Sequence, residues 1–166
     1  REPSTMTVTA EKGKTIRECA PAKLNLYLDV LGKRKDGYHD IVTLMQTINL
    51  MDELFFKTRE DGKITLQSEG EKLPPPKDNL IVKAAELLQE TTNTSLGVDI
   101  GLTKNIPIGS GLGGGSSDCA CTLKALNGIW KCNLETKKLT ELAAELGSDV
   151  PFFLKGGNAL CESRGE

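Results

Sequence analysis

The stretch of residues 107–117 constrains this chain most, because five of the seven residues 109–115 are glycines. The preceding residues 97–102 alternate as in a strand, and a helical pattern follows the glycines directly. A loop without β-carbons lets several backbone N–H groups converge on one anion, and the following helix adds the positive end of its dipole. The order strand, glycine loop, helix therefore predicts a site for a nucleotide phosphate.

Three well-known nucleotide-binding patterns do not fit this loop. A dinucleotide-binding loop needs a second strand ending in an acidic residue about 20 positions further on, and here a second helical pattern occupies that place. A P-loop needs a lysine directly before its Ser or Thr, whereas the chain has Gly115 followed by Ser116. The H-R-D and D-F-G motifs of protein kinases are absent. A glycine turn needed only for close packing stays open, although the two serines at the helix start favour phosphate or Mg²⁺.

Composition indicates an ordinary globular chain of 166 residues, with 38% hydrophobic and 27% charged residues. A formal net charge of −2 argues against a general nucleic-acid partner. No apolar run approaches the length of a membrane span, and no secretory signal is visible. The five cysteines are odd in number and lack a paired metal-binding spacing, which favours free thiols in a reducing compartment.

Strand and helix patterns interleave along the chain, which favours an α+β architecture with a mixed β-sheet packed on helices in two layers. Residues 1–15 are polar and aperiodic, and we expect a flexible leader there, with a tag remnant or part of a targeting segment as the alternatives. Apolar alternation predicts strands from near residue 16. The predicted strands are 24–30, 41–50, a hairpin of 53–58 and 63–67 around Asp61-Gly62, and 97–102.

Three helices are predicted after the proline run 74–76. The first covers about 79–91, with Asp78 as its N-cap. The second follows the glycine loop up to Trp130, with Asp118 as a capping residue at its start and no catalytic role. The third covers about 135–146 and ends at Gly147.

The glycine stretch resembles the phosphate-binding motif of the GHMP kinases, the superfamily named for galactokinase, homoserine, mevalonate and phosphomevalonate kinases. Three further stretches, residues 20–26, 35–39 and 147–152, resemble the branch that phosphorylates a cytidine diphosphate-linked sugar alcohol in non-mevalonate isoprenoid precursor biosynthesis. The resemblance implies that residues 16–166 form an N-terminal ATP-binding domain. It also implies a C-terminal domain that this chain lacks, so we expect the chain alone to be weakly active or inactive.

The resemblance further implies ATP and Mg²⁺ as cofactors and a location in the cytoplasm, or in the plastid of a plant or alga. Mg²⁺ would contact Ser116 or Ser117, and no carboxylate cluster forms a dedicated metal site. Asn79 and Lys104 are expected beside the adenine. The expected ATP-binding loop comprises Pro107, Ile108, Gly109, Ser110, Gly111, Leu112, Gly113, Gly114, Gly115, Ser116 and Ser117.

Lys23 and Asp149 are the candidate catalytic residues. Asp149 precedes an apolar stretch, where burial would raise its proton affinity, and the resemblance assigns the catalytic base to this position. Lys23 directly precedes the alternating residues 24–30, and we expect the strand to include it. It needs a partner if it faces inward, and the resemblance implies a Lys–Asp pair. A turn or capping aspartate and an outward-facing lysine are the alternatives.

Asn25, Tyr38 and His39 are the candidate substrate-binding residues. Asn25 lies on the same strand face as Lys23, near the expected hydroxyl. The resemblance implies that Tyr38 flanks the cytosine while His39, the only histidine, bonds its edge, although a lone histidine is often structural. Two other functions stay open: a mevalonate- or homoserine-type GHMP kinase, and a non-catalytic nucleotide- or anion-binding domain.

Overall fold

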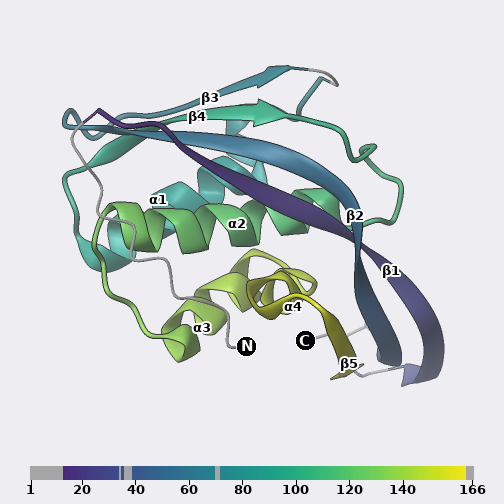
Figure 1. Cartoon of the computed structure of the whole chain (residues 1–166). Helices are drawn as coiled ribbons and strands as arrows, with labels where there is room; N and C mark the ends of the chain where they lie inside the picture. Colours follow the sequence, from purple (N-terminus) through teal and green to yellow (C-terminus); the bar gives the residue numbers. More distant parts are fainter. Residues whose placement is uncertain (1–12, 34, 36–38, 70–71, 164–166) are drawn as a thin grey trace, which may run out of the picture.

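The computed structural model describes residues 13–33, 35, 39–69 and 72–163 (Figure 1). Strands and helices interleave along the chain, as the sequence predicts. Their order is β1 (Ile16–Lys33), β2 (His39–Arg59), β3 (Ile64–Glu69), a 3-10 turn at Pro76–Asp78, α1 (Leu80–Thr92), β4 (Gly97–Thr103), α2 (Gly114–Ile129), α3 (Thr136–Leu146), α4 (Val150–Lys155) and β5 (Asn158–Ser163).

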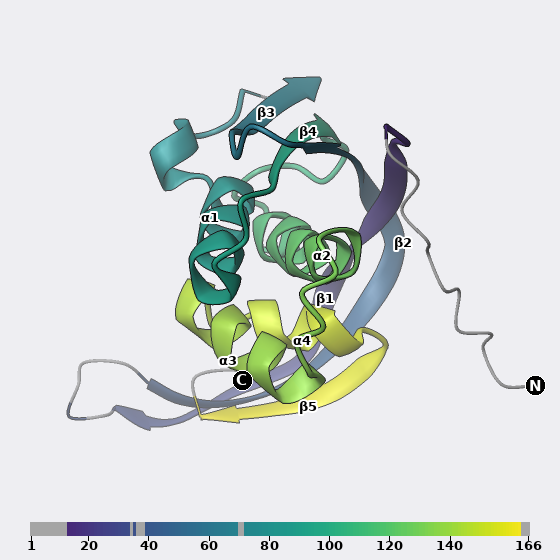
Figure 2. The same cartoon turned by 90° about the vertical axis from the view of Figure 1, so that its left-hand side faces the viewer.

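The described strands form one mixed sheet in the order β1-β2-β4-β3, and β5 pairs with β2. The β3–β4 pair is parallel and the other pairs are antiparallel. Figures 1 and 2 show the helices on one side of this sheet, with α2 beneath it, α1 alongside α2, and α3 and α4 further below. The predicted α+β fold with a mixed sheet packed on helices is confirmed.

The predicted hairpin around Asp61-Gly62 is wrong. The chain does turn there, but β4 occupies the position beside β2, and β3 lies on the far side of β4. Burial explains this order, because Val98, Ile100 and Leu102 on β4 are at most 2% exposed and suit a central strand. The β3 residues from Gln67 onward are exposed and suit an edge. The predicted strands 41–50 and 53–58 are parts of the single strand β2.

The core lies between the sheet and α2. Leu54 and Phe56 on β2 and Leu123 and Leu126 on α2 are fully buried. Trp130, at the end of α2, donates its indole N–H to the Gly97 carbonyl at 3.2 Å. The glycine loop leaves β4 and enters α2, so two of the most buried elements hold its ends.

The N-cap of α1 is Asn79, and the prediction of Asp78 is wrong. The Asn79 side chain accepts a hydrogen bond from the Ile81 backbone N–H at 2.9 Å. Asp78 instead belongs to the preceding 3-10 turn. The third predicted helix is confirmed as α3, whose C-cap is Gly147.

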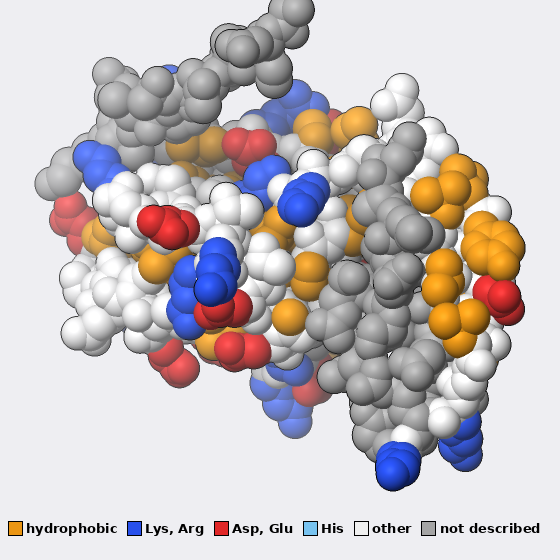
Figure 3. All heavy atoms as spheres, turned by 90° about the horizontal axis from the view of Figure 1, so that it is seen from below, with side chains coloured by type: hydrophobic (Ala, Val, Ile, Leu, Met, Phe, Trp, Pro, Cys, Tyr) orange, Lys and Arg blue, Asp and Glu red, His pale blue; other side chains and the backbone are white. Residues whose placement is uncertain are grey.

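The second half of β1, from Leu24 onward, and the part of β2 that pairs with it, up to Gln46, form an arm that extends beyond the helices (Figures 1 and 2). Several large apolar side chains on this arm are exposed, and Figure 3 shows apolar side chains gathered on that side of the molecule. The exposed apolar residues of the arm are Leu24, Leu26, Tyr27, Leu28, Val30, Leu31 and Leu44. No helix in the described part of the chain combines the length and apolarity needed to cross a membrane.

Candidate active site

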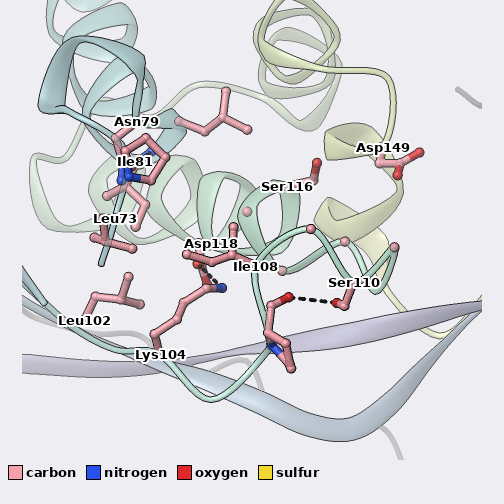
Figure 4. Close-up of a pocket in the computed structure, with 18 of the residues that line it drawn as sticks. Leu73, Asn79, Ile81, Leu102, Lys104, Ile108, Ser110, Ser116, Asp118 and Asp149 are labelled. Atoms are coloured by element: carbon pink, nitrogen blue, oxygen red, sulfur yellow. Dashed lines mark hydrogen bonds and ion pairs between the residues drawn. The ribbon is translucent and has the colours of Figure 1, made fainter. Parts of the chain in front are cut away.

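A cleft of about 570 Å³ runs along the glycine loop (Figure 4). One end is largely apolar and lies between the start of α1 and the end of β4, where Leu73, Ile81 and Leu102 line it. The other end is polar, with Lys23 and Asp149 among its lining residues. The apolar end suits a nucleobase, the backbone N–H groups of the loop suit phosphates, and the charged end suits the molecule that accepts the phosphate.

The loop requires glycine at several positions. Gly109, Gly111 and Gly113 have φ values of 71°, 77° and 72°, in the left-handed region. A β-carbon on Gly113 would also lie 2.9 Å from Phe153 Cζ and 3.1 Å from Lys23 Cγ. At Gly114, where α2 begins, a β-carbon would lie 2.8 Å from Lys104 Nζ. Side chains therefore pack directly on the loop backbone.

Two hydrogen bonds fix the course of the loop. The Ser110 hydroxyl donates to the Pro107 carbonyl at 2.7 Å, a bond drawn in Figure 4. The Leu112 carbonyl accepts from the Lys23 backbone N–H at 2.9 Å, which attaches the loop to β1. Because β1 also carries the Lys23 side chain, one residue both holds the loop and faces the cleft.

The two serines at the helix start face different ways. Ser116 lines the cleft, whereas Ser117 is 1% exposed and lines a second, smaller cavity. The Ser117 hydroxyl has no hydrogen-bond partner among the described residues. Of the predicted ATP-binding loop, all residues except Leu112 and Ser117 line the cleft.

Lys23, Asn25 and Asp149 meet at the polar end of the cleft. Lys23 Nζ donates to Asn25 Oδ1 at 3.2 Å and lies 3.8 Å from Asp149 Oδ2. The Lys23 side chain is 5% exposed and the Asp149 side chain 35%, so Asp149 is not buried as the apolar sequence around it predicted. Asp149 occupies the N-cap position of α4 but makes no capping hydrogen bond through its side chain. Its carboxylate is therefore open to the cleft.

A buried charge network lies beneath the loop. Lys104 Nζ contacts Asp52 Oδ2 and lies 3.1 Å from Asp118 Oδ2, and all three side chains are at most 4% exposed. Burial, reinforced by the nearby Asp52 charge, raises the pKa of Asp118 to about 7, although Lys104 opposes the shift. Asp118 is thus an ion-paired side chain within α2, and the prediction that it caps the helix is wrong.

Comparison with known proteins places this geometry in a family. Residues 79–157 match the family model for the GHMP kinases N terminal domain. Residues 79–157 therefore carry a GHMP kinase N-terminal domain. It is 51% identical over 154 residues to 4-diphosphocytidyl-2-C-methyl-D-erythritol kinase of Prochlorococcus marinus strain MIT 9215, covering 93% of this chain and 50% of the relative. The same-named protein of strain MIT 9313 is 53% identical over 148 residues, with 89% and 46% covered.

Solved structures agree with this placement of the GHMP domain. A crystal structure of 4-(cytidine 5'-diphospho)-2C-methyl-D-erythritol kinase superposes with a TM-score of 0.78 at 42% identity, covering 91% of this chain and 53% of that one. Homoserine kinase from Cytophaga hutchinsonii shares the fold, with a TM-score of 0.68 at 24% identity over 94% of this chain and 50% of that one. The chain spans about half the length of the relatives it matches.

The remaining predicted site residues divide into two groups. Asn79 and Lys104 line the cleft, but Asn79 caps α1 and the Lys104 ammonium is already held by two carboxylates. Tyr38 lies outside the described residues. His39 begins β2, opposite Lys33 in the arm, and its side chain also lies outside the described part.

Sequence reasoning missed Asp52. A signal was available, because the period of two along a strand places residue 52 on the same face as Leu54 and Phe56. Both are fully buried, as is Asp52. A carboxylate on a core-facing position needs partners, and the network above supplies them.

Proposed function

We propose that this chain is the nucleotide-binding half of an ATP-dependent kinase that phosphorylates the 2-hydroxyl of 4-diphosphocytidyl-2-C-methyl-D-erythritol. The observation that carries the proposal is the open Asp149 carboxylate beside Lys23, at the end of a glycine loop. The names of relatives about 51% identical support the choice of substrate. We further propose residues 16–166 as the ATP-binding domain of this kinase, working in the cytoplasm, or in the plastid of a plant or alga.

The glycine loop would bind the triphosphate through its backbone. Three glycines of the loop take the left-handed conformation, in which a loop can aim several backbone N–H groups at one anion, and α2 begins directly after them. The adenine would lie in the apolar slot near Leu73 and Ile81, with Asn79 and Lys104 beside it. The loop has no lysine of its own, so positive charge for the phosphates must come from elsewhere in the cleft.

Mg²⁺ fits the oxygen donors at the polar end of the cleft. Among the described residues, no group of three or more His, Cys, Asp or Glu side chains could hold a metal ion. Mg²⁺ in kinases instead uses one or two protein oxygens together with substrate phosphates. The Ser116 hydroxyl lines the cleft and could serve, whereas Ser117 lines a different cavity. When bound with the nucleotide, the ion neutralises charge on the phosphate oxygens.

Asp149 and Lys23 would divide the chemical work. The substrate hydroxyl gives its proton to the Asp149 carboxylate as its oxygen bonds to the γ-phosphorus, and the bond from that phosphorus to the β–γ bridging oxygen breaks to release ADP. Lys23 would stabilise the developing charge on the attacking oxygen. Asn25 holds Lys23 in place through its Oδ1 atom, and Thr43 donates to the same atom at 3.3 Å. Tyr38 and His39 stay our predicted contacts for the cytosine.

The test is phosphoryl transfer measured in the full-length protein. Radiolabelled γ-phosphate from ATP should appear on 4-diphosphocytidyl-2-C-methyl-D-erythritol and not on mevalonate or homoserine. Transfer to mevalonate or homoserine alone would replace the substrate assignment with another GHMP kinase activity. ATP binding without transfer to any of the three would favour a non-catalytic nucleotide-binding domain.

A further inference from the structure

Asp52 is a fully buried carboxylate that takes no part in the proposed chemistry. It lies in β2, next to the residue that pairs with the end of β4. Asp52 is not among the residues that line the cleft. Its position directly beneath the start of the glycine loop calls for a different kind of role.

Asp52 binds the chain segment that joins β4 to the loop. Its Oδ1 atom accepts from the backbone N–H of Asn105 at 2.6 Å and of Ile106 at 2.8 Å, and its Oδ2 atom contacts Lys104 Nζ. The Asn105 side chain adds a bond to the Met51 carbonyl at 2.9 Å. Three consecutive residues are thus held immediately before Pro107, where the loop begins.

The same network reaches the other end of the loop. Lys104 also donates to Asp118 Oδ2 on α2 at 3.1 Å. Gly114, the first residue of α2, lies so close that a β-carbon there would be 2.8 Å from Lys104 Nζ and 2.9 Å from Ile106 Cγ2. The entry and the exit of the loop are therefore fixed to one another through Asp52 and Lys104.

Stability alone does not account for such a network. One ammonium faces two buried carboxylates, and the desolvation of buried charges commonly offsets their attraction. Asp118 Oδ1 is in addition buried without a hydrogen-bond partner among the described residues. The network does restrain geometry. A carboxylate that accepts hydrogen bonds from two successive backbone N–H groups restricts the conformation of that backbone.

We propose that Asp52 is a positioning residue for nucleotide binding: it fixes where the glycine loop leaves β4, so that the loop N–H groups are already aimed at the nucleotide phosphates. The inference rests on the proposed ATP-dependent function. Preorganisation of this kind lowers the entropy lost when the ligand binds. Loss of Asp52 should therefore weaken nucleotide binding more than it slows the chemical step.

The test uses Asp52→Asn in the full-length protein, with the Kd for ATP and the steady-state constants measured together. Asn keeps the size of the side chain but removes the charge and sets an amide against Lys104. We expect the Kd and the KM for ATP to rise about tenfold, as expected for one charged hydrogen bond, while kcat and the KM of the acceptor change less than about twofold. The matched control is Asp99→Asn, which breaks an ion pair with Arg59 elsewhere on the sheet and should leave all four constants unchanged.

A purely structural role predicts a different result, namely a lower active fraction with both KM values and the Kd unchanged, and that result would overturn the proposal. If Asp52→Asn does not fold, Asp52→Glu decides, because Glu keeps the negative charge opposite Lys104 while its longer side chain displaces the carboxylate from the backbone N–H groups of Asn105 and Ile106. A rise of about threefold in the Kd for ATP supports the proposal, and no change rejects it. The Kd for ATP is measured without the molecule that accepts the phosphate, so it tests the role of Asp52 even if the substrate assignment is wrong.

Discussion

Lys23 Nζ lies 3.8 Å from Asp149 Oδ2, although the two residues come from opposite ends of the chain. The lysine is buried and held by Asn25, whereas the aspartate is about one-third exposed and lines the cleft. The fixed partner is thus the cation, and the open partner is the group that can accept a proton. This asymmetry suits a carboxylate that must receive a hydroxyl on its free side.

Asp149→Asn should remove this proton acceptor while leaving the nucleotide in place. In the full-length protein we expect kcat to fall by about 10² to 10⁴-fold, the range for loss of a general base, with the KM for ATP within about twofold. Steady-state kinetics at saturating acceptor would measure both constants. Asp61→Asn, in the turn between β2 and β3, is the control and should keep the full rate. A variant that retains the original kcat would rule out the role given to Asp149.

Gly113→Ala should destabilise the fold more than Gly111→Ala does. Both glycines have φ above 70°, so each substitution costs about 1 kcal/mol of backbone strain. A β-carbon at Gly111 meets nothing within 4 Å, but at Gly113 it would press on Phe153 and Lys23. We therefore expect an additional loss of about 1–2 kcal/mol for Gly113→Ala, measured by urea unfolding. Equal losses would mean that Phe153 and Lys23 move aside freely.

Helices α1 to α3 and the glycine loop could be predicted from the sequence because their signals are local, whereas the short helix α4 (Val150–Lys155) was not predicted. The apolar stripe of α3 and its Gly147 stop give its bounds closely. Sheet order is not a local property, since the turn at Gly62 is compatible with a β2–β3 hairpin until β4 is known to take that position. Which of β3 and β4 pairs with β2 depends on burial against helices that lie elsewhere in the sequence.

The candidate site was predictable in its parts but not in its arrangement. A helix turns about 100° per residue, so only one of Ser116 and Ser117 can face the cleft, but periodicity alone does not say which. The apolar residues after Asp149 indicate burial, yet the carboxylate itself lies at the cleft surface. The pairing of Asp52 with Lys104 joins two strands that the predicted hairpin had kept apart.

Leu123→Ala should destabilise the domain strongly, because Leu123 is fully buried between α2 and the sheet. Truncation of a buried leucine costs about 2–5 kcal/mol through lost burial and the cavity left behind. Leu31→Ala in the arm is the matched control, since Leu31 is 65% exposed in this chain and should change the free energy of unfolding by less than about 0.5 kcal/mol. Urea unfolding of both variants would show whether the core and the arm contribute as their burial predicts.

Asp118→Asn should change how stability depends on pH. Burial raises the pKa of Asp118 to about 7, so between pH 5 and 7 the folded state holds a proton that the unfolded state has released. The bound proton stabilises the folded state. This contribution to the free energy of unfolding is fully present below the pKa of the unfolded state and is lost as the pH rises through the pKa of the folded state. The wild type should therefore lose about 2–3 kcal/mol between pH 5 and 8 relative to the variant, whose amide cannot titrate.

Urea unfolding of both proteins at pH 5, 6, 7 and 8 measures this difference. Asp99→Asn serves as the control, because hydrogen bonds from Thr65 and Arg59 lower the pKa of Asp99, which leaves it ionised throughout this range in both states. The free energy of unfolding of Asp99→Asn should depend on pH in the same way as that of the wild type. Parallel curves for Asp118→Asn as well would mean that Lys104 keeps Asp118 ionised, and that the buried network carries its full charge at every pH tested.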